Sequence, residues 1–291
     1  MLRFYHDAGK VLYFNETGLK QSVIIDVQWF VDVFKHVITD TLHVDGIIGS
    51  SGDWYEYYET GNLKDTLLEN IWADSKKTDT LCHKQTILDF MQRLGLVAVG
   101  KESHYVPCMN RKEMNDNQKN ILQSKSKSSL LVYRFKVLPF FFFFRLVVAC
   151  MQEKGWTVPK SEGISYLYKN MALFAFGQYN IILSVTADSI QLQVLHAQDE
   201  QSLDERKTRQ IQGTVETHLN AIIGTFHKKL MFVRGIRCQE DKSTPFAMKI
   251  EGYFLEEKDI QSEDQNEICP QHRLENKHKI NLYELKKYWV F

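Results

Sequence analysis

Residues 95–102, Gly-Leu-Val-Ala-Val-Gly-Lys-Glu, come within one residue of the phosphate-binding loop G-x-x-x-x-G-K-[ST]. Glu102 stands where that loop has the Ser or Thr that binds Mg²⁺. Such a loop binds phosphate when a strand leads into it and a helix begins at its end. Here we expect a helix that ends at Gly95, a strand over 96–99 and a turn at Lys101. We therefore interpret the segment as structural and keep a degenerate GTP-binding protein as an alternative.

A second group of residues has the chemistry of zinc ligands. Cys269-Pro-Gln-His272 is followed by His278, and Cys238 lies upstream. The two-residue gap suits a zinc knuckle, whereas the other spacings are irregular, and a turn cysteine beside surface histidines has the same pattern. Whether Cys269, His272 and His278 bind zinc is left open, and we assign no metal site.

No pattern in the sequence predicts catalysis. The nucleophile pattern G-x-S-x-G does not occur, and no Cys/His pair has supporting context. His6 and Asp7 have the residue types of an acid/base pair, but we interpret His6 as a packed histidine at a helix end. We therefore expect a protein that is not an enzyme, with no catalytic residue, no cofactor-binding residue and no cofactor.

Composition limits the protein class. The 291 residues are 44% hydrophobic and 12% aromatic, which is enough for a core and about two domains. Lys plus Arg equals Asp plus Glu at 36 each, so no overall field favours nucleic acid or an anionic membrane. Five scattered cysteines favour reduced thiols and the cytoplasm. The most apolar segment, 137–151, contains Arg145 and is too short for a membrane span, so we expect a buried helix.

The elements expected in residues 1–112 resemble a winged helix. A helix ends near Gly9, short strands follow at 11–14 and 23–25, and Asp26 caps a helix to Val37. Helices at 67–72 and 81–94 precede a hairpin of strands 96–99 and 104–106. The second helix offers only Lys84 and Arg93 for phosphates, so we favour protein docking and keep a winged-helix nucleic-acid-binding module as an alternative.

The rest of the chain predicts an α+β domain with an antiparallel sheet packed with helices. Residues 113–129 are polar and form the expected linker. Residues 130–255 form the second domain, and residues 256–291 form an acidic loop and a C-terminal docking segment. Five consecutive phenylalanines, 140–144, cover every face of one helix, so we expect them mainly in the core, with part of one face at an interface. The expected strands are 130–136, 164–176, 181–186, 190–196, 231–237 and 246–254, and the expected helices are 139–153 and 204–229.

Four blocks in order resemble the COR domain, the C-terminal-of-Roc module of Roco proteins. The first block is 2–39, which resembles the start of the COR domain; in the family a helix ending in His-x-x-Gly leads there to a strand and then to Asp-Pro-Gln-Trp. The other blocks are LLENIW with ILDFMQRLGLVAV, then YVPCM, and then LVYRFKVLPFFFFFRLVVACMQEKG. Val27 replaces the usual proline of the first block, which removes rigidity at the helix start but not the fold. The matching positions of the first block are His6, Gly9, Asp26, Gln28 and Trp29.

The resemblance implies a scaffold. In Roco proteins the COR domain follows a Ras-like GTPase domain, its first half packs on that GTPase, and its second half commonly mediates dimerisation. This chain has no GTPase domain. Because it starts within a helix, we expect it to be a piece of a larger Roco protein. We therefore expect a scaffold in GTPase-linked signalling, with a Roc-type GTPase domain in cis or in trans and a second copy as partners. The sequence leaves the partner's identity, the pathway and the oligomeric state open.

Overall fold

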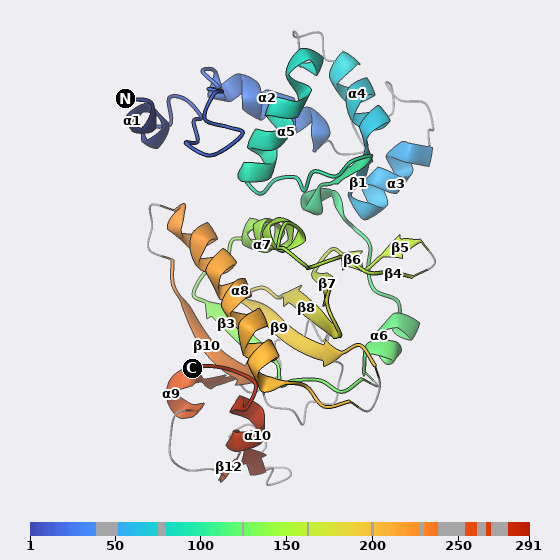
Figure 1. Cartoon of the computed structure of the whole chain (residues 1–291), viewed down its shortest axis with the longest axis vertical. Helices are drawn as coiled ribbons and strands as arrows, with labels where there is room; N and C mark the ends of the chain where they lie inside the picture. Colours follow the sequence, from blue (N-terminus) through green and yellow to red (C-terminus); the bar gives the residue numbers. More distant parts are fainter. Residues whose placement is uncertain are drawn as a thin grey trace. The chain divides into compact units, whose positions relative to one another are not determined.

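The computed structural model describes residues 1–38, 52–74, 80–123, 125–161, 163–198, 201–226, 230–237, 254–260, 266–268 and 279–291. Two compact units divide the chain, Met1–Lys112 and Glu113–Phe291. Helices and strands of both units are labelled in Figure 1. The α+β fold class predicted from the sequence is confirmed.

The first unit has the element order of a winged helix. After α3 come β1 and the helices α4 and α5, and the chain then returns through residue 98 to β2. β2 pairs with β1 in antiparallel register, and Tyr105 also bridges Ala98. The elements of this unit are α1 (Leu2–Asp7), α2 (Val27–Val37), α3 (Gly52–Thr60), β1 (Asn62–Lys64), α4 (Asp65–Asp74), η2 (Leu81–His83), α5 (Lys84–Arg93), β2 (Ser103–Tyr105) and η3 (Pro107–Met109).

Local chemistry sets the helix ends of this unit. Asp26 caps α2, where its Oδ1 accepts a hydrogen bond of 2.9 Å from the amide of Trp29. Gly95 follows α5 with φ of 71°, a conformation that glycine adopts without strain. The buried faces of the helices meet in one core, which includes Phe30, Tyr57, Leu68, Ile87, Phe90 and Met91.

Three expectations for the first unit are corrected. The strands expected at 11–14 and 23–25 reduce to one bridge between Leu12 and Ile24. The strand expected at 96–99 reduces to the bridge at Ala98, and the main partner of β2 is β1, which the sequence analysis did not predict. The helix α3 was not predicted either.

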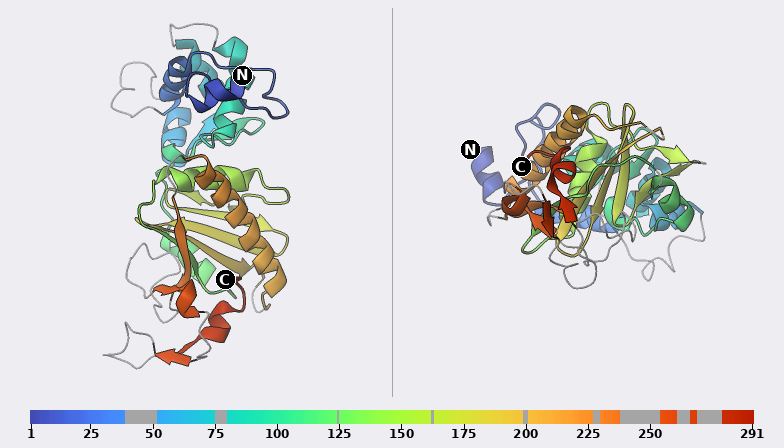
Figure 2. Two further views of the ribbon diagram at one scale, coloured as in Figure 1. Left: turned by 90° about the vertical axis from the view of Figure 1, so that its left-hand side faces the viewer. Right: turned by 90° about the horizontal axis from the view of Figure 1, so that it is seen from below.

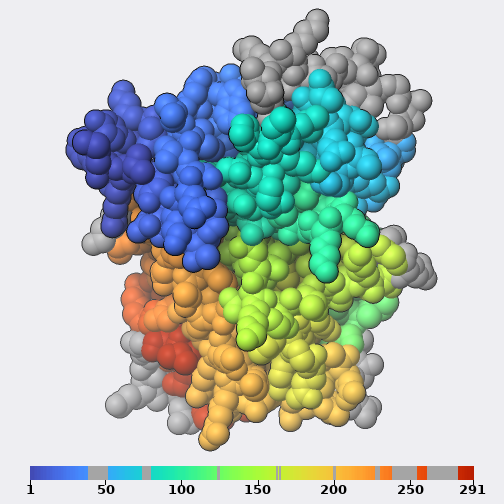
Figure 3. All heavy atoms as spheres, turned by 45° about the horizontal axis from the view of Figure 1, so that its top comes forward, coloured from blue at the N-terminus to red at the C-terminus, as the bar shows by residue number. Residues whose placement is uncertain are grey.

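A seven-stranded antiparallel sheet forms the centre of the second unit, in the order β11-β10-β3-β9-β8-β7-β6. The helices α7 and α8 pack against each other and lie across one face of the sheet (Figures 1 and 2). The polar side of α8, the orange segment in Figure 3, faces solvent. The strands are β3 (Leu131–Phe135), β4 (Lys160–Ser161), β5 (Ile164–Ser165), β6 (Leu167–Tyr168), β7 (Met171–Phe176), β8 (Tyr179–Val185), β9 (Ser189–His196), β10 (Phe232–Arg237), β11 (Phe254–Glu256), β12 (Asn266–Ile268) and β13 (Lys279–Asn281). The helices are α6 (Asp116–Gln123), α7 (Phe141–Met151), α8 (Glu205–Gly224), α9 (Glu257–Ile260) and α10 (Leu282–Lys286).

Both faces of the central strand β9 are buried. Ile190, Leu192 and Val194 alternate with Gln191 and Gln193 as the sequence predicts, yet all eight residues of the strand are buried. Gln193 donates a hydrogen bond of 3.0 Å from Nε2 to the carbonyl of residue 128, which offsets the cost of burying an amide.

The polar segment 113–129, expected as a linker, belongs to the second unit and contains α6. Leu122 of α6 and Met114 pack with Leu173, Ile182 and Leu195 of the sheet. Because successive side chains of a strand lie on opposite faces, Ile182 lies on the sheet face opposite to Ile181 and Leu183, and this cluster covers the face of Ile182.

The C-terminal region also differs from expectation. The acidic stretch 256–267, expected as a solvated loop, contains α9 and part of β11 and β12, and Ile260 is buried. The expected boundary at 255/256 therefore falls inside β11, which pairs with β10. The strand expected at 164–176 is divided into β5, β6 and β7. Of the strand expected at 246–254, only residue 254 is described, and residues 227–229 at the end of the expected helix 204–229 lie outside the described residues.

Over the described ranges, no helix has both the length and the apolar character needed to cross a membrane.

Candidate protein-interaction surface

The segment that resembles a phosphate loop is a helix end, a bridge and a turn. Gly95 ends α5, and β2 rather than a helix follows Lys101. Two of its amides already have partners, because Ala98 donates to the carbonyl of Tyr105 and Val99 donates to Oε1 of Gln92. A phosphate loop needs free amides that converge on the anion, so this geometry does not form one.

The geometry of the turn explains why residue 100 is a glycine. A Cβ atom at this position would lie 2.3 Å from the main-chain oxygen of Ser103, closer than real Cβ contacts come. The glycine therefore permits the tight approach of the turn to β2.

Both cationic side chains of α5 are paired with carboxylates. Nζ of Lys84 lies 2.6 Å from Oδ2 of Asp65 and 2.8 Å from Oε1 of Glu69, and Arg93 lies 2.7 Å from Glu16. The hydrogen bond from Lys84 is the main cause of the lowered pKa of the Asp65 carboxyl. In residues 1–112, 15 Asp and Glu stand against 12 Lys and Arg. This surface is therefore poorly suited to bind the phosphates of a nucleic acid.

The other candidate residues from the sequence are His6 and the possible zinc ligands. His6 lies in the last turn of α1, and its Nδ1 lies 3.3 Å from the carbonyl oxygen of Val11, which suits a packed histidine at a helix end. Within the described part of the chain, no group of three His, Cys, Asp or Glu residues is placed to hold a metal ion. The possible zinc ligands Cys238, Cys269, His272 and His278 lie outside the described residues, so the zinc hypothesis stays a prediction.

The five phenylalanines divide between the core and the surface. Phe142 and Phe143 are 0% and 1% exposed, whereas Phe140 and Phe141 are 42% and 44% exposed. Val137, which precedes them, is 66% exposed. We call Val137, Phe140 and Phe141 the Phe140–Phe141 patch.

Ring contacts connect this patch to the core. The ring centroids of Phe141 and Phe226 are 5.5 Å apart, those of Phe226 and Phe142 are 4.7 Å apart, and Phe142 lies 6.2 Å from Phe135. Phe141 and Phe142 lie on α7, Phe226 follows the end of α8, and Phe135 lies on β3, so three parts of the second unit support the exposed ring of Phe141. Such support leaves little side-chain entropy to lose when a partner binds.

A cation lies beside the patch. The guanidinium carbon of Arg145 is 5.9 Å from the ring centroid of Phe226, and its Nη1 donates to Oγ1 of Thr225. Aromatic residues with an arginine at the edge are typical of protein–protein interfaces. The patch can therefore bury apolar area against a partner protein.

The sequence predicted a helix mainly in the core with part of one face at an interface, but it did not predict which rings are exposed. A run of five phenylalanines gives no hydrophobic face, and only the position of the sheet decides which rings point inward. A signal for the buried side of the helix lies in the residues that follow the phenylalanines. Leu146, Val147 and Cys150 continue this buried side at helical spacing.

Comparisons with known proteins identify no relative: no protein-family model matches the chain, and no curated protein matches it. The resemblance to COR domains therefore depends on the four sequence blocks alone.

Proposed function

We propose that the chain is a non-enzymatic COR-type scaffold, which binds or dimerises proteins in GTPase-linked signalling in the cytoplasm. The observation that supports this most is the Phe140–Phe141 patch, in which Phe140 and Phe141 are 42% and 44% exposed and the ring of Phe141 is fixed to the core through Phe226 and Phe142. Fully burying an exposed phenylalanine side chain contributes about 1.5–3 kcal/mol, and a half-exposed ring gains only part of this, so both rings together are suited to anchor a partner.

The first unit supports protein docking over nucleic-acid binding. In a winged helix the second helix of the pair presents its exposed face to DNA, and here that helix is α5. Because Lys84 and Arg93 are already paired with carboxylates, DNA binding would require these ion pairs to break. The proposed partner of this unit is a Ras-like GTPase domain of the Roc type.

Light scattering over a concentration series tests the proposed homodimer. We expect the mass of the purified chain to rise toward that of a dimer, and we expect Phe141→Ser to shift this rise to at least about tenfold higher concentration. Phe4→Ser serves as the matched control, since Phe4 is 71% exposed and lies in α1 of the first unit. Thermal unfolding of both variants checks that the fold is kept.

Two outcomes count against the proposal. A monomeric mass at every concentration removes the homodimer. A purified Roc-type GTPase domain that shows no binding to the chain by calorimetry, in either its GDP form or its GTP form, removes the GTPase partner. Both results together would overturn the scaffold proposal.

A further inference from the structure

The second unit contains a pocket that the proposed scaffold function does not use. Its volume is about 430 Å³, which is within the usual range of about 300–1,000 Å³ for small-molecule sites. It lies between the first turns of α8, the end of α9 and the C-terminal segment. The lining residues are Glu205, Arg209, Ile260, Tyr283, Lys286, Lys287, Trp289 and Phe291.

Two cations on this lining keep unused donors. Arg209 uses Nη2 for both of its hydrogen bonds, 3.1 Å to Oε2 of Glu205 and 2.8 Å to the carbonyl of Lys287. Its Nε and Nη1 have no partner among the described residues, and its side chain is 42% exposed. The side-chain ammonium of Lys286 makes no hydrogen bond or ion pair with a described residue, whereas its carbonyl accepts from the amide of Trp289. Lys287 is paired with Glu284 and is therefore less available.

Aromatic side chains form another part of the lining. Trp289 is 3% exposed, and its Nε1 donates a hydrogen bond of 2.7 Å to Oγ of Ser129, which fixes the indole. Tyr283 is 58% exposed, and Phe291 is half-buried. The pocket thus combines a fixed aromatic group with two cations that have free donors.

We infer that this pocket binds a small aromatic anion, with one ring and one phosphate or carboxylate group. The ring would lie against Trp289 and Tyr283, where apolar and edge contacts are favourable. The anionic group would accept charge-assisted hydrogen bonds from Arg209 and Lys286. Glu205, the one carboxylate side chain on the lining, is held by Arg209 and does not need to move.

Calorimetry with phenyl phosphate on the full chain tests the inference. We expect saturable binding, with phenol and inorganic phosphate each weaker by at least about tenfold, because each lacks one half of the recognised group. Arg209→Gln and Lys286→Gln are each expected to weaken phenyl phosphate binding by about tenfold. Lys207→Gln is the control, since this exposed lysine lies on α8 but not on the pocket.

A second measurement does not depend on any variant. In the unmodified chain, phenyl phosphate is expected to shift the nuclear magnetic resonance signal of the Trp289 indole more than those of the other tryptophans. The inference is overturned if phenyl phosphate does not bind. It is also overturned if inorganic phosphate binds equally well, or if neither variant changes the affinity.

Discussion

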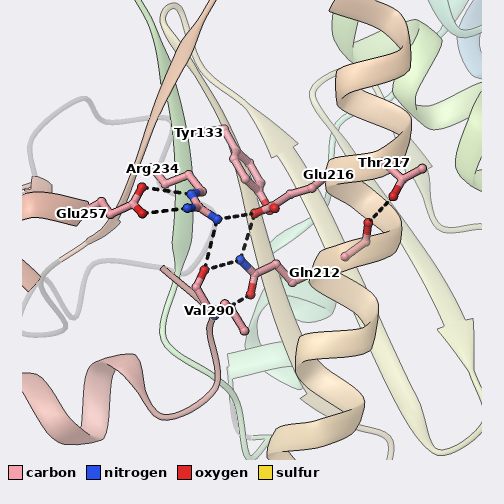
Figure 4. A network of polar contacts seen from close by, with 8 residues as sticks. Tyr133, Gln212, Glu216, Thr217, Arg234, Glu257 and Val290 are labelled. Carbon is pink, nitrogen blue, oxygen red and sulfur yellow. Dashed lines mark hydrogen bonds and ion pairs between the residues drawn. The ribbon is translucent and has the colours of Figure 1, made fainter. Parts of the chain in front are cut away.

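Gln212 and Val290 exchange two hydrogen bonds. Nε2 of Gln212 donates to the carbonyl of Val290, the amide of Val290 donates to Oε1 of Gln212, and each N–O distance is 2.8 Å (Figure 4). Gln212 lies on α8 and is 2% exposed, so its side-chain amide pairs with the main chain as a neighbouring strand would. The C-terminal segment is therefore held through its backbone, largely independently of the side chain at residue 290.

We expect Gln212→Ala to destabilise the second unit by about 1–2 kcal/mol, because both main-chain groups of Val290 lose this partner. Urea unfolding measures the loss, and faster hydrogen exchange at the amide of Val290 locates it. Gln210→Ala is the control on the same helix, since Gln210 is exposed, and it is expected to change stability by less than about 0.5 kcal/mol. Equal effects of the two changes would contradict a specific role of Gln212.

Arg234 connects the same segment to two other elements. It donates to both carboxylate oxygens of Glu257, at 3.0 and 2.7 Å, lies 3.5 Å from Glu216 and donates to the carbonyl of Val290. Its side chain is 25% exposed, so solvent screens these contacts only in part. Removal of the guanidinium would leave two carboxylates close together without their cation.

We expect Arg234→Met to cost about 2–4 kcal/mol, somewhat less than the loss of one partner from a fully buried pair. Arg234→Lys keeps the charge but not the planar fork, so its cost is expected to be smaller but still measurable. Chemical denaturation of the three proteins gives this order. If Arg234→Lys were as damaging as Arg234→Met, geometry alone would explain the network, and the charge would contribute nothing.

Helices with local signals were predictable from the sequence. Asp26 and Asp204 each stand before an amphipathic run, and both side chains accept hydrogen bonds from amides in the first turn of the helix that follows. A cap and a period of 3.6 are properties of neighbouring residues, so no knowledge of the rest of the chain is needed. The starts of α2 and α8 follow from these signals.

Strand pairing between distant residues was not predictable. β1 has three residues, which are too few to show an alternation of apolar and polar side chains. It forms because it pairs with β2, in a register that places Leu63 opposite His104. The helix α6 was missed for a related reason, since it is mostly polar and only a few apolar residues, Leu122 among them, dock on the sheet. In both cases the partner surface, and not the segment itself, decides the structure.

The candidate surfaces show the same limit. The phenylalanine run indicated a buried helix, but the exposure of Phe140 and Phe141 depends on where β3 and α8 lie. The contact between Gln212 and Val290 joins residues 78 positions apart, and neither residue type signals it. Around Gly100 the predicted order of elements was informative. A helix comes before the strand there, which is the reverse of the order in a phosphate loop.

Two glycine substitutions with opposite expected signs test the structural role of Gly100. Gly100→Ala is expected to destabilise the first unit by about 1–3 kcal/mol, since the added Cβ meets the main chain of Ser103 at 2.3 Å. Gly213→Ala is expected to stabilise the second unit by about 0.5–1 kcal/mol, because this glycine lies within α8 with nothing within 4 Å of an added Cβ. Thermal unfolding measures both. A neutral Gly100→Ala would show that the turn adapts.

The lowered pKa of Asp65 predicts a pH-dependent contribution to stability. The hydrogen bond from Lys84 is the largest cause of the lowered pKa, and a hydrogen bond that the carboxylate accepts from His104 lowers it further, whereas desolvation by burial raises it. Because the folded-state pKa lies below the ordinary value of 3.8, the contribution is present above that value and is lost as the pH falls through the folded-state pKa. The relevant window is therefore below about pH 4.

Urea unfolding at several pH values tests this prediction with Asp65→Asn. The variant is expected to be less stable than the unmodified chain at pH 6, and the difference is expected to shrink below about pH 4. The loss at pH 6 is expected to be small, since the side chain of Asp65 is 37% exposed and solvent screens it. Asp89→Asn controls for the removal of a carboxylate elsewhere on the winged helix. A difference that stayed constant with pH would remove the ionised carboxylate as the cause.

Duplex DNA binding is the measurement that separates the scaffold proposal from the winged-helix alternative. We expect no saturable binding of a labelled duplex at micromolar protein and about 50 mM salt, because Lys84 and Arg93 are paired within the unit. Replacing Glu16 and Glu69 by glutamine removes one carboxylate partner from each cation, so the double variant is expected to bind the duplex weakly and with a salt dependence.

A control is needed because the double variant also changes the net charge. Asp7→Asn with Asp32→Asn removes the same two negative charges from the first unit without changing the partners of Lys84 or Arg93. If this control gained as much DNA affinity as the double variant, the gain would reflect net charge and not the release of α5. Salt-dependent micromolar binding by the unmodified chain would contradict the prediction and favour a nucleic-acid-binding module, because phosphate contacts weaken steeply as salt competes with them.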